Sequence, residues 1–271
     1  METEKPTPLV SILIPVFNRE ELIEATIRSA LGQTYSNIEV VVVDNASTDR
    51  TYEVLIDLAA TESRLRIFRN SENIGPVRNW ERCIAEARGQ FGKILWSDDL
   101  IEPAFVQSCV SPLSDPDIGF VFTEALEFQD GTGKVLRSRY KIGKSGVYSS
   151  NYFIRESLLF GDVPYSPGCA MFRLCDLREV LEVDVPNYLH ADYASLAIGN
   201  DVLIFLNVAA RYQSFYFVDE PLSLFRNHAG SITYQSSDRQ LYYCAAKSYF
   251  AERHSLAVSY THLTLPTIYS V

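Results

Sequence analysis

Apolar runs alternate with amphipathic segments through the first part of the chain. The runs 9–17 and 38–44 are almost continuously apolar, which is typical of strands buried on both faces of a sheet. Two shorter runs follow, and the segments between the runs place their apolar residues at helical spacing. This order predicts an α/β fold with a doubly wound, parallel sheet and right-handed crossovers. The predicted strands are 9–17, 38–44, 64–68 and 91–96, and the predicted helices are 19–33, 47–60 and 77–89.

Residues that favour helix ends support two of these helices. Gly32 suits the C-terminal end of the first helix, because glycine is common just after the last helical turn. Ser47 is the expected N-cap of the second helix, and Asp49 falls in its first turn, where the helix dipole favours an anion. We therefore expect the second helix to begin directly after Ser47.

The alternation becomes less regular after residue 110. A "DGTG" turn separates two predicted strands, and three apolar segments have helical spacing. No segment rich in Pro, Gly or Ser divides the chain, so we expect a single domain over residues 1–254. The further predicted strands are 118–128, 133–140 and 215–222, and the further predicted helices are 151–161, 173–182 and 201–212.

The segment 255–271 has a different composition from the rest of the chain. It contains no Asp, Glu, Lys or Arg, although the preceding residues carry charges at an ordinary density. It resembles the read-through of a cloning or sequencing adapter, so we expect an artefactual, non-native tail and exclude it from the fold. We also expect the native gene product to continue with a different C-terminal part.

Charge and cysteine content exclude several classes of function. The formal net charge is −10, which leaves no basic excess to neutralise the phosphates of nucleic acid, so we expect no nucleic-acid partner. The start "METEKPTP" is not a signal peptide, and no apolar run is long enough to cross a bilayer. Five cysteines without a CxxC pattern are typical of reduced thiols. These features predict a cytoplasmic protein.

Polar residues follow three of the predicted parallel strands, where each strand ends. These segments are Pro15–Asn18, Asp44–Ser47 and Trp96–Asp99. In doubly wound sheets, ligands bind beyond the carboxyl ends of the strands. The chain has no glycine-rich phosphate loop, so a bound diphosphate would need another neutralising group, and a divalent metal is the obvious candidate.

Each candidate acid also has a structural interpretation. Asp98 and Asp99 could hold Mg²⁺ or Mn²⁺, or they could cap the helix that follows. Asp44 could contact a base or ribose, or it could start the turn after its strand. Asp201 precedes a strongly apolar helix, so it could be a helix cap or a general base with a raised pKa. His228 could bind metal or phosphate, or it could be structural.

Six segments in this order resemble the family 2 glycosyltransferases with the GT-A fold. They are "VSILIPVFNRE", "VVVDNASTD", "NIGPVRNW", "LWSDD", "GND" and "VDEPLSLFRNHAGSIT". The resemblance covers about residues 8–235. It implies a GT-A-type, mostly parallel sheet flanked by helices, with a nucleotide-binding half at 1–110 and an acceptor-side half at 111–254.

The resemblance implies a nucleotide site at the strand ends. Asp44 would contact the base, commonly a uracil, and Asn79 would lie near the ribose or diphosphate. Gly75 would allow close approach of the nucleotide. The residues implied to bind the nucleotide are Pro15, Phe17, Asn18, Asp44, Gly75, Asn79 and Arg226.

The resemblance also implies the catalytic and metal-binding residues. Asp98 would be the main ligand of Mg²⁺ or Mn²⁺, with Asp99 beside it. Arg226 and His228 would approach the diphosphate or metal from the other side. Asp201 would be the catalytic base.

Two positions depart from the family pattern. The first acid of the Asp-x-Asp motif is replaced by Trp96, so one ligand is missing. The usual Glu before the base is replaced by Asn200. Asp201 has the family spacing to the "VDEPL" segment, whereas the superficially similar "HADY" segment makes Asp192 the runner-up.

The resemblance implies an inverting, metal-assisted transfer of a sugar from a nucleotide sugar, most often a UDP-sugar, to a glycan or lipid-linked acceptor. The implied setting is bacterial surface polysaccharide synthesis, and peripheral association with the inner face of the membrane stays open. Two alternatives also stay open. One is a nucleotide-sugar-binding protein without turnover, and the other is a nucleotidyltransferase, although "PVFNREE" lacks the glycine-rich basic loop of that class.

Overall fold

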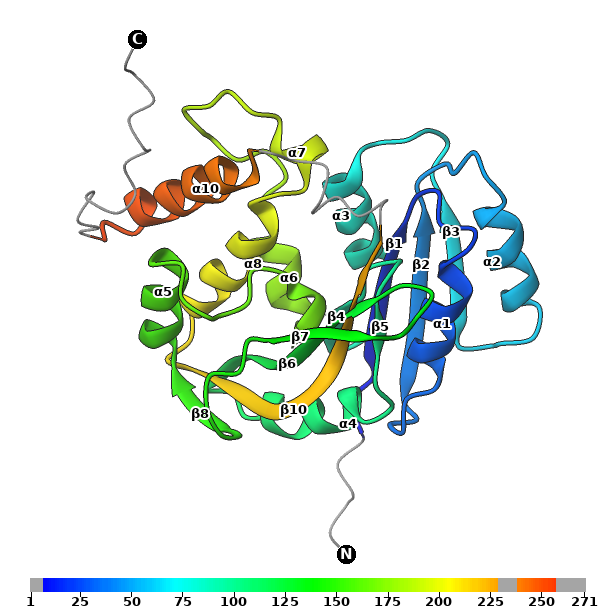
Figure 1. Ribbon diagram of the computed structural model, residues 1–271, viewed down its shortest axis with the longest axis horizontal. Helices are drawn as coiled ribbons and strands as arrows, with labels where there is room; N and C mark the ends of the chain where they lie inside the picture. Colours follow the sequence, from blue (N-terminus) through cyan, green and yellow to red (C-terminus); the bar gives the residue numbers. More distant parts are fainter. Residues whose placement is uncertain (1–6, 229–237, 257–271) are drawn as a thin grey trace, which may run out of the picture.

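The computed structural model describes residues 7–228 and 238–256. Within these residues ten strands form one sheet, in the order β3-β2-β1-β4-β9-β6-β10-β5, with β7 added beside β6 and β8 beside β10 (Figure 1). Helices cover both faces of this sheet. Segment 229–237 and most of the predicted tail, 257–271, lie outside the described residues.

The N-terminal half has the predicted alternation of strands and helices. Strands β1, β2, β3 and β4 pair in parallel, so the expected α/β sheet is confirmed. The elements are β1 (Val10–Val16), α1 (Ile23–Leu31), β2 (Ile38–Asp44), α2 (Thr51–Ala59), β3 (Leu65–Arg69), α3 (Pro76–Glu86) and β4 (Phe91–Ile94).

The second half adds the long strand β10, next to the edge strand β5, and a cluster of helices. Strand β10 pairs in parallel with β6 along most of its length, and β9 is inserted antiparallel between β4 and β6. The elements are β5 (Leu100–Ile101), α4 (Phe105–Leu113), β6 (Ile118–Gln129), β7 (Val135–Arg139), β8 (Gly146–Ser149), α5 (Ser150–Leu158), the 3₁₀ turn η1 (Pro167–Cys169), β9 (Ala170–Arg173), α6 (Leu174–Val180), α7 (Tyr193–Leu196), α8 (Asn200–Ala209), β10 (Ser214–Asn227) and α10 (Arg239–Arg253).

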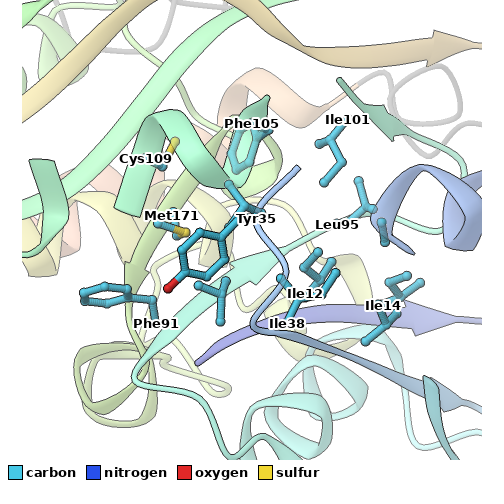
Figure 2. Packing of buried hydrophobic residues seen from close by; sticks show 14 of the residues in the cluster. Ile12, Ile14, Tyr35, Ile38, Phe91, Leu95, Ile101, Phe105, Cys109 and Met171 are labelled. Atoms are coloured by element: carbon cyan, nitrogen blue, oxygen red, sulfur yellow. The ribbon is translucent and has the colours of Figure 1, made fainter. Parts of the chain in front are cut away.

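The continuous apolar runs exist because the sheet is covered on both faces. In β1, Ile12 and Ile14 pack into the cluster on the side of α1, α2 and α4, whereas Leu13 packs on the opposite face. Figure 2 shows Ile12 beside Ile38, with Ile14 and Phe105 of α4 in the same cluster. Helices α3, α6 and α8 cover the other face, and a third cluster joins α10 to α8.

Two helix starts differ from the prediction for the same reason. Helix α2 begins at Thr51, and Ser47 does not cap it. The Ser47 hydroxyl instead accepts a hydrogen bond from the Asn18 N–H at 2.9 Å. The N–H of Arg19 donates to the Thr51 hydroxyl at 2.7 Å, so residue 19 is not part of α1. The two loops hydrogen-bond to each other, and this delays both helices.

The predicted end of the first helix agrees with the structure. The first helix ends at Gly32 as expected, with the Gly32 N–H donating to the Arg28 carbonyl at 2.9 Å. Cys169 ends η1, which leads directly into β9. Among the described helices, none combines the length and apolar character that a membrane span requires.

A cluster of buried phenylalanine rings packs around β6 and β10, on the face of the sheet that α3, α6 and α8 cover. The Phe120 ring is fully buried and is stacked on the Phe215 ring, with 5.2 Å between centroids. Its other aromatic neighbours are Phe122, Phe153, Phe172 and Phe205. This packing anchors the strand that leads to Arg226.

We predict that Phe120→Ala lowers the free energy of unfolding by about 3–5 kcal/mol, because it removes a buried ring and leaves a cavity. Val147 is 61% exposed, so the control Val147→Ala should change that free energy by about 0.5 kcal/mol or less. Urea unfolding followed by circular dichroism measures both. Equal losses in the two variants would contradict this account of the core.

Candidate active site

The carboxyl ends of β1 and β2 meet in a network of loop hydrogen bonds. Val16 pairs with Asp44, so the loops that follow the two strands start side by side. The Thr48 N–H donates to Asn18 Oδ1 at 2.9 Å. Asn18 has a positive φ of 51°, a conformation that asparagine tolerates better than most residues. Two of the segments predicted to converge are therefore in contact.

Asp44 has a structural role: it starts the turn after its strand, which is one of the two roles considered from the sequence. It is fully buried, and its Oδ1 accepts a hydrogen bond from the Ser47 N–H at 3.1 Å. Its Oδ2 also lies 3.1 Å from Arg69 Nε, a partner that the sequence analysis did not identify. The carboxylate thus starts the turn and is neutralised by Arg69. Contact with a base stays a prediction.

The other residues predicted to bind a nucleotide lie around these loops. Pro15 is buried in β1, beyond the last residue that pairs with β4, and Phe17 is 37% exposed. Gly75 has a φ of +85° directly before α3. Asn79 is buried, because its amide donates to the Val43 carbonyl at 3.0 Å and accepts from Asn70 at 2.9 Å. Asn79 therefore connects α3 to β2 and to Asn70, the residue after β3.

The acidic turn after β4 is surrounded by basic side chains. Asp98 Oδ2 lies 2.9 Å from His228 Nε2 and 3.7 Å from Arg19 Nη2. The Arg226 Nε donates to the Asp98 carbonyl at 2.8 Å. Asp98, Arg226 and His228, which come from the two halves of the chain, are thus brought together as predicted.

Asp99 has a different environment from its neighbour. It is buried, and its Oδ1 accepts a hydrogen bond from the Arg226 backbone N–H at 2.8 Å. Burial, together with the adjacent Asp98 charge, raises the pKa of Asp99 well above its ordinary value. Lys93, buried in β4 beneath this turn, has a pKa lowered to about 8 by desolvation. Asp99 therefore fastens the turn to β10.

The arrangement fits a divalent metal only in part. Within the described residues, no three His, Cys, Asp or Glu side chains converge to hold a metal ion. Asp98 Oδ2 and His228 Nε2 could nevertheless be two adjacent ligands, because octahedral ligands at about 2.1 Å lie about 3 Å apart. Mg²⁺ usually combines one or two protein ligands with substrate phosphates and water. The pair therefore fits a metal that a diphosphate helps to hold.

Trp96 occupies the position of the missing acid. Its Nε1 donates to the Ser166 hydroxyl at 2.7 Å, and its ring lies 4.7 Å from the Trp80 ring. The indole therefore fixes the end of β4 to the segment before η1. Turn η1 contacts both β4 and α8, so it connects the acidic turn to the helix that carries Asp201.

Asp201 is buried at the start of α8, with 6% of its surface exposed. Its Oδ1 accepts hydrogen bonds from the N–H groups of Gly199 and Val202, both at 2.9 Å. Its Oδ2 accepts one from the Tyr243 hydroxyl at 2.7 Å. Burial raises the pKa of Asp201 to about 6, despite these hydrogen bonds. Asp201 therefore lies in the first turn of α8 and is not its N-cap, which is Gly199. Its role as a general base stays a prediction.

The runner-up acid has no comparable environment. Asp192 is exposed and caps α7, accepting hydrogen bonds from the Ser195 N–H and hydroxyl. The bond from Ser195 lowers the pKa of Asp192. Of the two carboxylates, Asp201 thus combines burial with a raised pKa.

A cavity of about 530 Å³ lies elsewhere, at the C-terminal end of α8. Asp201 lies at the N-terminal end of the same helix, and none of the predicted site residues lines the cavity. The residues that line it come from the start of α5, the end of α8 and the end of α10, and include Ser150, Arg211 and His254.

The comparisons with known proteins agree with this geometry. A family profile described as "Glycosyl transferase family 2" matches residues 11–181. The chain belongs to glycosyltransferase family 2. The match includes β1 to β4 and the acidic turn, whereas α8 and β10 lie beyond it.

Relatives of this family 2 chain match about half of its length. The protein named "Putative glycosyltransferase EpsH" of Bacillus subtilis is 33% identical over 133 residues, which is 49% of this chain and 38% of that protein. The chondroitin synthase of Escherichia coli is 36% identical over 123 residues, or 45% of this chain and 18% of that protein. These matches thus span less than half the length of either relative.

The fold extends beyond the region of sequence similarity. The crystal structure of residues 1–349 of Staphylococcus aureus TarS in complex with UDP-GlcNAc covers 84% of this chain and 61% of that one. The TM-score is 0.64 at 17% sequence identity. This likeness shows a common fold and confirms the expected GT-A-type architecture.

We predict that Asp99→Asn becomes increasingly stable, relative to the unchanged protein, as the pH rises from 5 to 8. The pKa of Asp99 is higher in the folded state than in the unfolded state, so ionising it destabilises the fold as pH rises. Asn keeps an acceptor for the Arg226 N–H but carries no charge. Urea unfolding at several pH values measures the difference, and the exposed Asp117→Asn is the control. A difference independent of pH would contradict the raised pKa.

Proposed function

We propose that this chain transfers a sugar from a nucleotide diphosphate sugar to an acceptor hydroxyl, with inversion of the anomeric configuration. The observation that carries this proposal is the 2.9 Å contact between Asp98 and His228, which are 130 positions apart, with Arg19 and Arg226 beside them. A cluster of this kind at the carboxyl edge of a parallel sheet suits a diphosphate.

The donor would lie across the ends of β1, β2 and β4. The exposed Phe17 ring and the loop from Asp44 would hold the nucleoside, and Arg19 would neutralise the diphosphate. Asp98 and His228 would hold Mg²⁺ or Mn²⁺, which supplies positive charge where the leaving diphosphate becomes more negative. The UDP-GlcNAc in the TarS complex, on the same fold, supports a UDP-sugar as the donor.

Asp201 would act as the general base. Its Oδ2 takes the proton of the acceptor hydroxyl while that oxygen forms a bond to the anomeric carbon. The bond between the anomeric carbon and the diphosphate oxygen breaks, and the nucleoside diphosphate leaves with the electron pair. A pKa of about 6 keeps the carboxylate ionised at pH 7 and more basic than an exposed aspartate.

The acceptor is proposed from the names of relatives. Chondroitin synthase makes a polysaccharide, and another relative is named "Putative teichuronic acid biosynthesis glycosyltransferase TuaG", with 30% identity over 126 residues. We therefore propose a glycan or lipid-linked glycan acceptor, at the cytoplasmic side of the cell membrane. The nucleotide-binding half 1–110 and the acceptor-side half 111–254 would form one catalytic domain.

We predict that UDP-sugars with Mn²⁺ raise the melting temperature of the protein, because a ligand at 100 times its Kd stabilises by about 2.7 kcal/mol. For a domain of this size that is a rise of roughly 5–10 °C. In Asp98→Ala the part of the rise that depends on Mn²⁺ should be lost, and EDTA should have the same effect on the unchanged protein. GDP-, dTDP- and CMP-sugars serve as comparison ligands. A rise that is the same with Asp98→Ala and with Mn²⁺ absent would contradict the metal site.

We predict that Asp201→Asn lowers the rate of UDP-sugar hydrolysis, with water as acceptor, by about 10²- to 10⁴-fold, because it removes the base. Binding of the donor should be unchanged. The matched control Asp192→Asn should stay within about twofold of the unchanged protein, because Asp192 caps α7. UDP release measures both. If Asp192→Asn lost activity and Asp201→Asn kept it, the assignment of the base would be reversed. If the unchanged protein bound the donor without hydrolysis or transfer, a binding protein without turnover would be favoured.

A further inference from the structure

Helix α10 places the hydroxyl of Tyr243 beside Asp201, the proposed base. Figure 1 shows α10 lying across the start of α8, and the two helices pack in the third apolar cluster. From α10, the Tyr243 hydroxyl donates to Asp201 Oδ2 at 2.7 Å, across 42 positions of the chain. Tyr243 lies beyond the region matched by the family profile, which ends at residue 181.

The described hydrogen bonds to Asp201 leave one acceptor position of its carboxylate unfilled. Oδ1 already accepts two backbone N–H groups, from Gly199 and Val202. An ionised carboxylate has about four acceptor positions, two on each oxygen. The described residues fill both positions on Oδ1 and one on Oδ2. The second position of Oδ2, next to Tyr243, is therefore the one that the described residues leave for an acceptor hydroxyl.

The Tyr243 hydroxyl is held in place by the anchoring of α10. The Tyr193 hydroxyl donates to the Tyr242 carbonyl at 2.6 Å, and the Tyr243 ring packs against Tyr165 with 5.2 Å between centroids. One turn further on, the buried Lys247 donates to the Ser157 carbonyl at 2.5 Å. Such contacts fix the phenol, so little conformational entropy is lost when it binds Asp201.

Three titratable side chains of the described residues interact electrostatically with Asp201. Tyr243 and Lys247 come from α10, and Tyr140 comes from the segment after β7. Lys247 is packed over the Phe160 ring at 3.7 Å, and burial lowers its pKa to about 7. Of these three side chains, Tyr243 is the one that hydrogen-bonds to the carboxylate.

We propose that Tyr243 is a positioning residue for the transfer. Its hydroxyl stabilises the ionised form of Asp201 and occupies one acceptor position of Oδ2, so that the acceptor hydroxyl binds at the other. The proposal rests on the proposed role of Asp201 as the base. A hydrogen bond to the charged form of an acid favours that form, so loss of the phenol hydroxyl raises the pKa of Asp201. Tyr243→Phe removes the hydroxyl and keeps the ring.

The first test measures the carboxyl group directly and needs no substrate. The protein is labelled with ¹³C at the aspartate carboxyl carbons, and the Asp201 signal is the one missing from Asp201→Asn. In the unchanged protein this signal should titrate with a midpoint near pH 6. In Tyr243→Phe the midpoint should rise by about one to two pH units, the worth of a hydrogen bond to a charged group.

A matched tyrosine provides the control. The Tyr212 hydroxyl donates to Asp176 Oδ2 at 2.8 Å, so Tyr212→Phe removes the same kind of bond at a distance from the site. Its Asp201 midpoint should equal that of the unchanged protein. An unchanged midpoint in Tyr243→Phe, or an equal rise in Tyr212→Phe, would overturn the proposal.

The second test is the pH profile of UDP-sugar hydrolysis. At pH 6.5, Tyr243→Phe should be about 3- to 25-fold slower than the unchanged protein, because a smaller fraction of Asp201 is ionised in the variant. The difference should shrink above pH 8.5, where Asp201 is mostly ionised in both. A loss that is the same at every pH would mean a purely structural role and would overturn the proposal. Full hydrolysis by Asp201→Asn would instead refute the base itself, whatever the titration of the carboxyl shows.

Discussion

The rest of the site depends on the three contacts that Arg226 makes. Its backbone N–H bonds to Asp99, its Nε bonds to the Asp98 carbonyl, and its Nη1 lies 2.5 Å from Asp130 Oδ1. Two adjacent acids repel each other, and Arg226 offsets that repulsion from a strand that is distant in sequence. It also sets the position of His228, two residues further on, beside Asp98. The positive groups beside the acidic turn, Arg19 and Arg226, are therefore part of the protein, and a metal would add to their charge.

Burial then determines what each acid can do. Asp44 is buried but neutralised by Arg69, which suits a structural turn. Asp201 receives hydrogen bonds from neutral donors, and desolvation raises its pKa to about 6. The two buried aspartates thus differ in environment, because one carboxylate has a guanidinium partner and the hydrogen bonds to the other come from neutral groups. This difference separates the proposed donor side from the proposed acceptor side.

The sequence predicted the strands and helices of the first half well, because strands buried on both faces leave continuous apolar runs. It did not predict β9, a four-residue strand that is too short to show a period, nor α10, whose apolar positions have a weak pattern. Among the site residues, the approach of Arg226 and His228 to Asp98 came from family resemblance. The partners Arg69 and Tyr243 were missed, because pairing across the fold leaves no local signal. The start of α2 was wrong because two loops bond to each other.

We propose that Asp98 and His228 would hold a metal together with the diphosphate of a donor, at the edge of the sheet where Asp44 ends β2. Crystals of this protein grown with UDP and Mn²⁺ and measured at the manganese absorption edge would locate both ligands. We expect an anomalous peak at bonding distance from Asp98 Oδ2 and His228 Nε2, next to the diphosphate, with the uracil beside Asp44. A nucleotide bound away from this edge, or manganese bound without either residue, would contradict it.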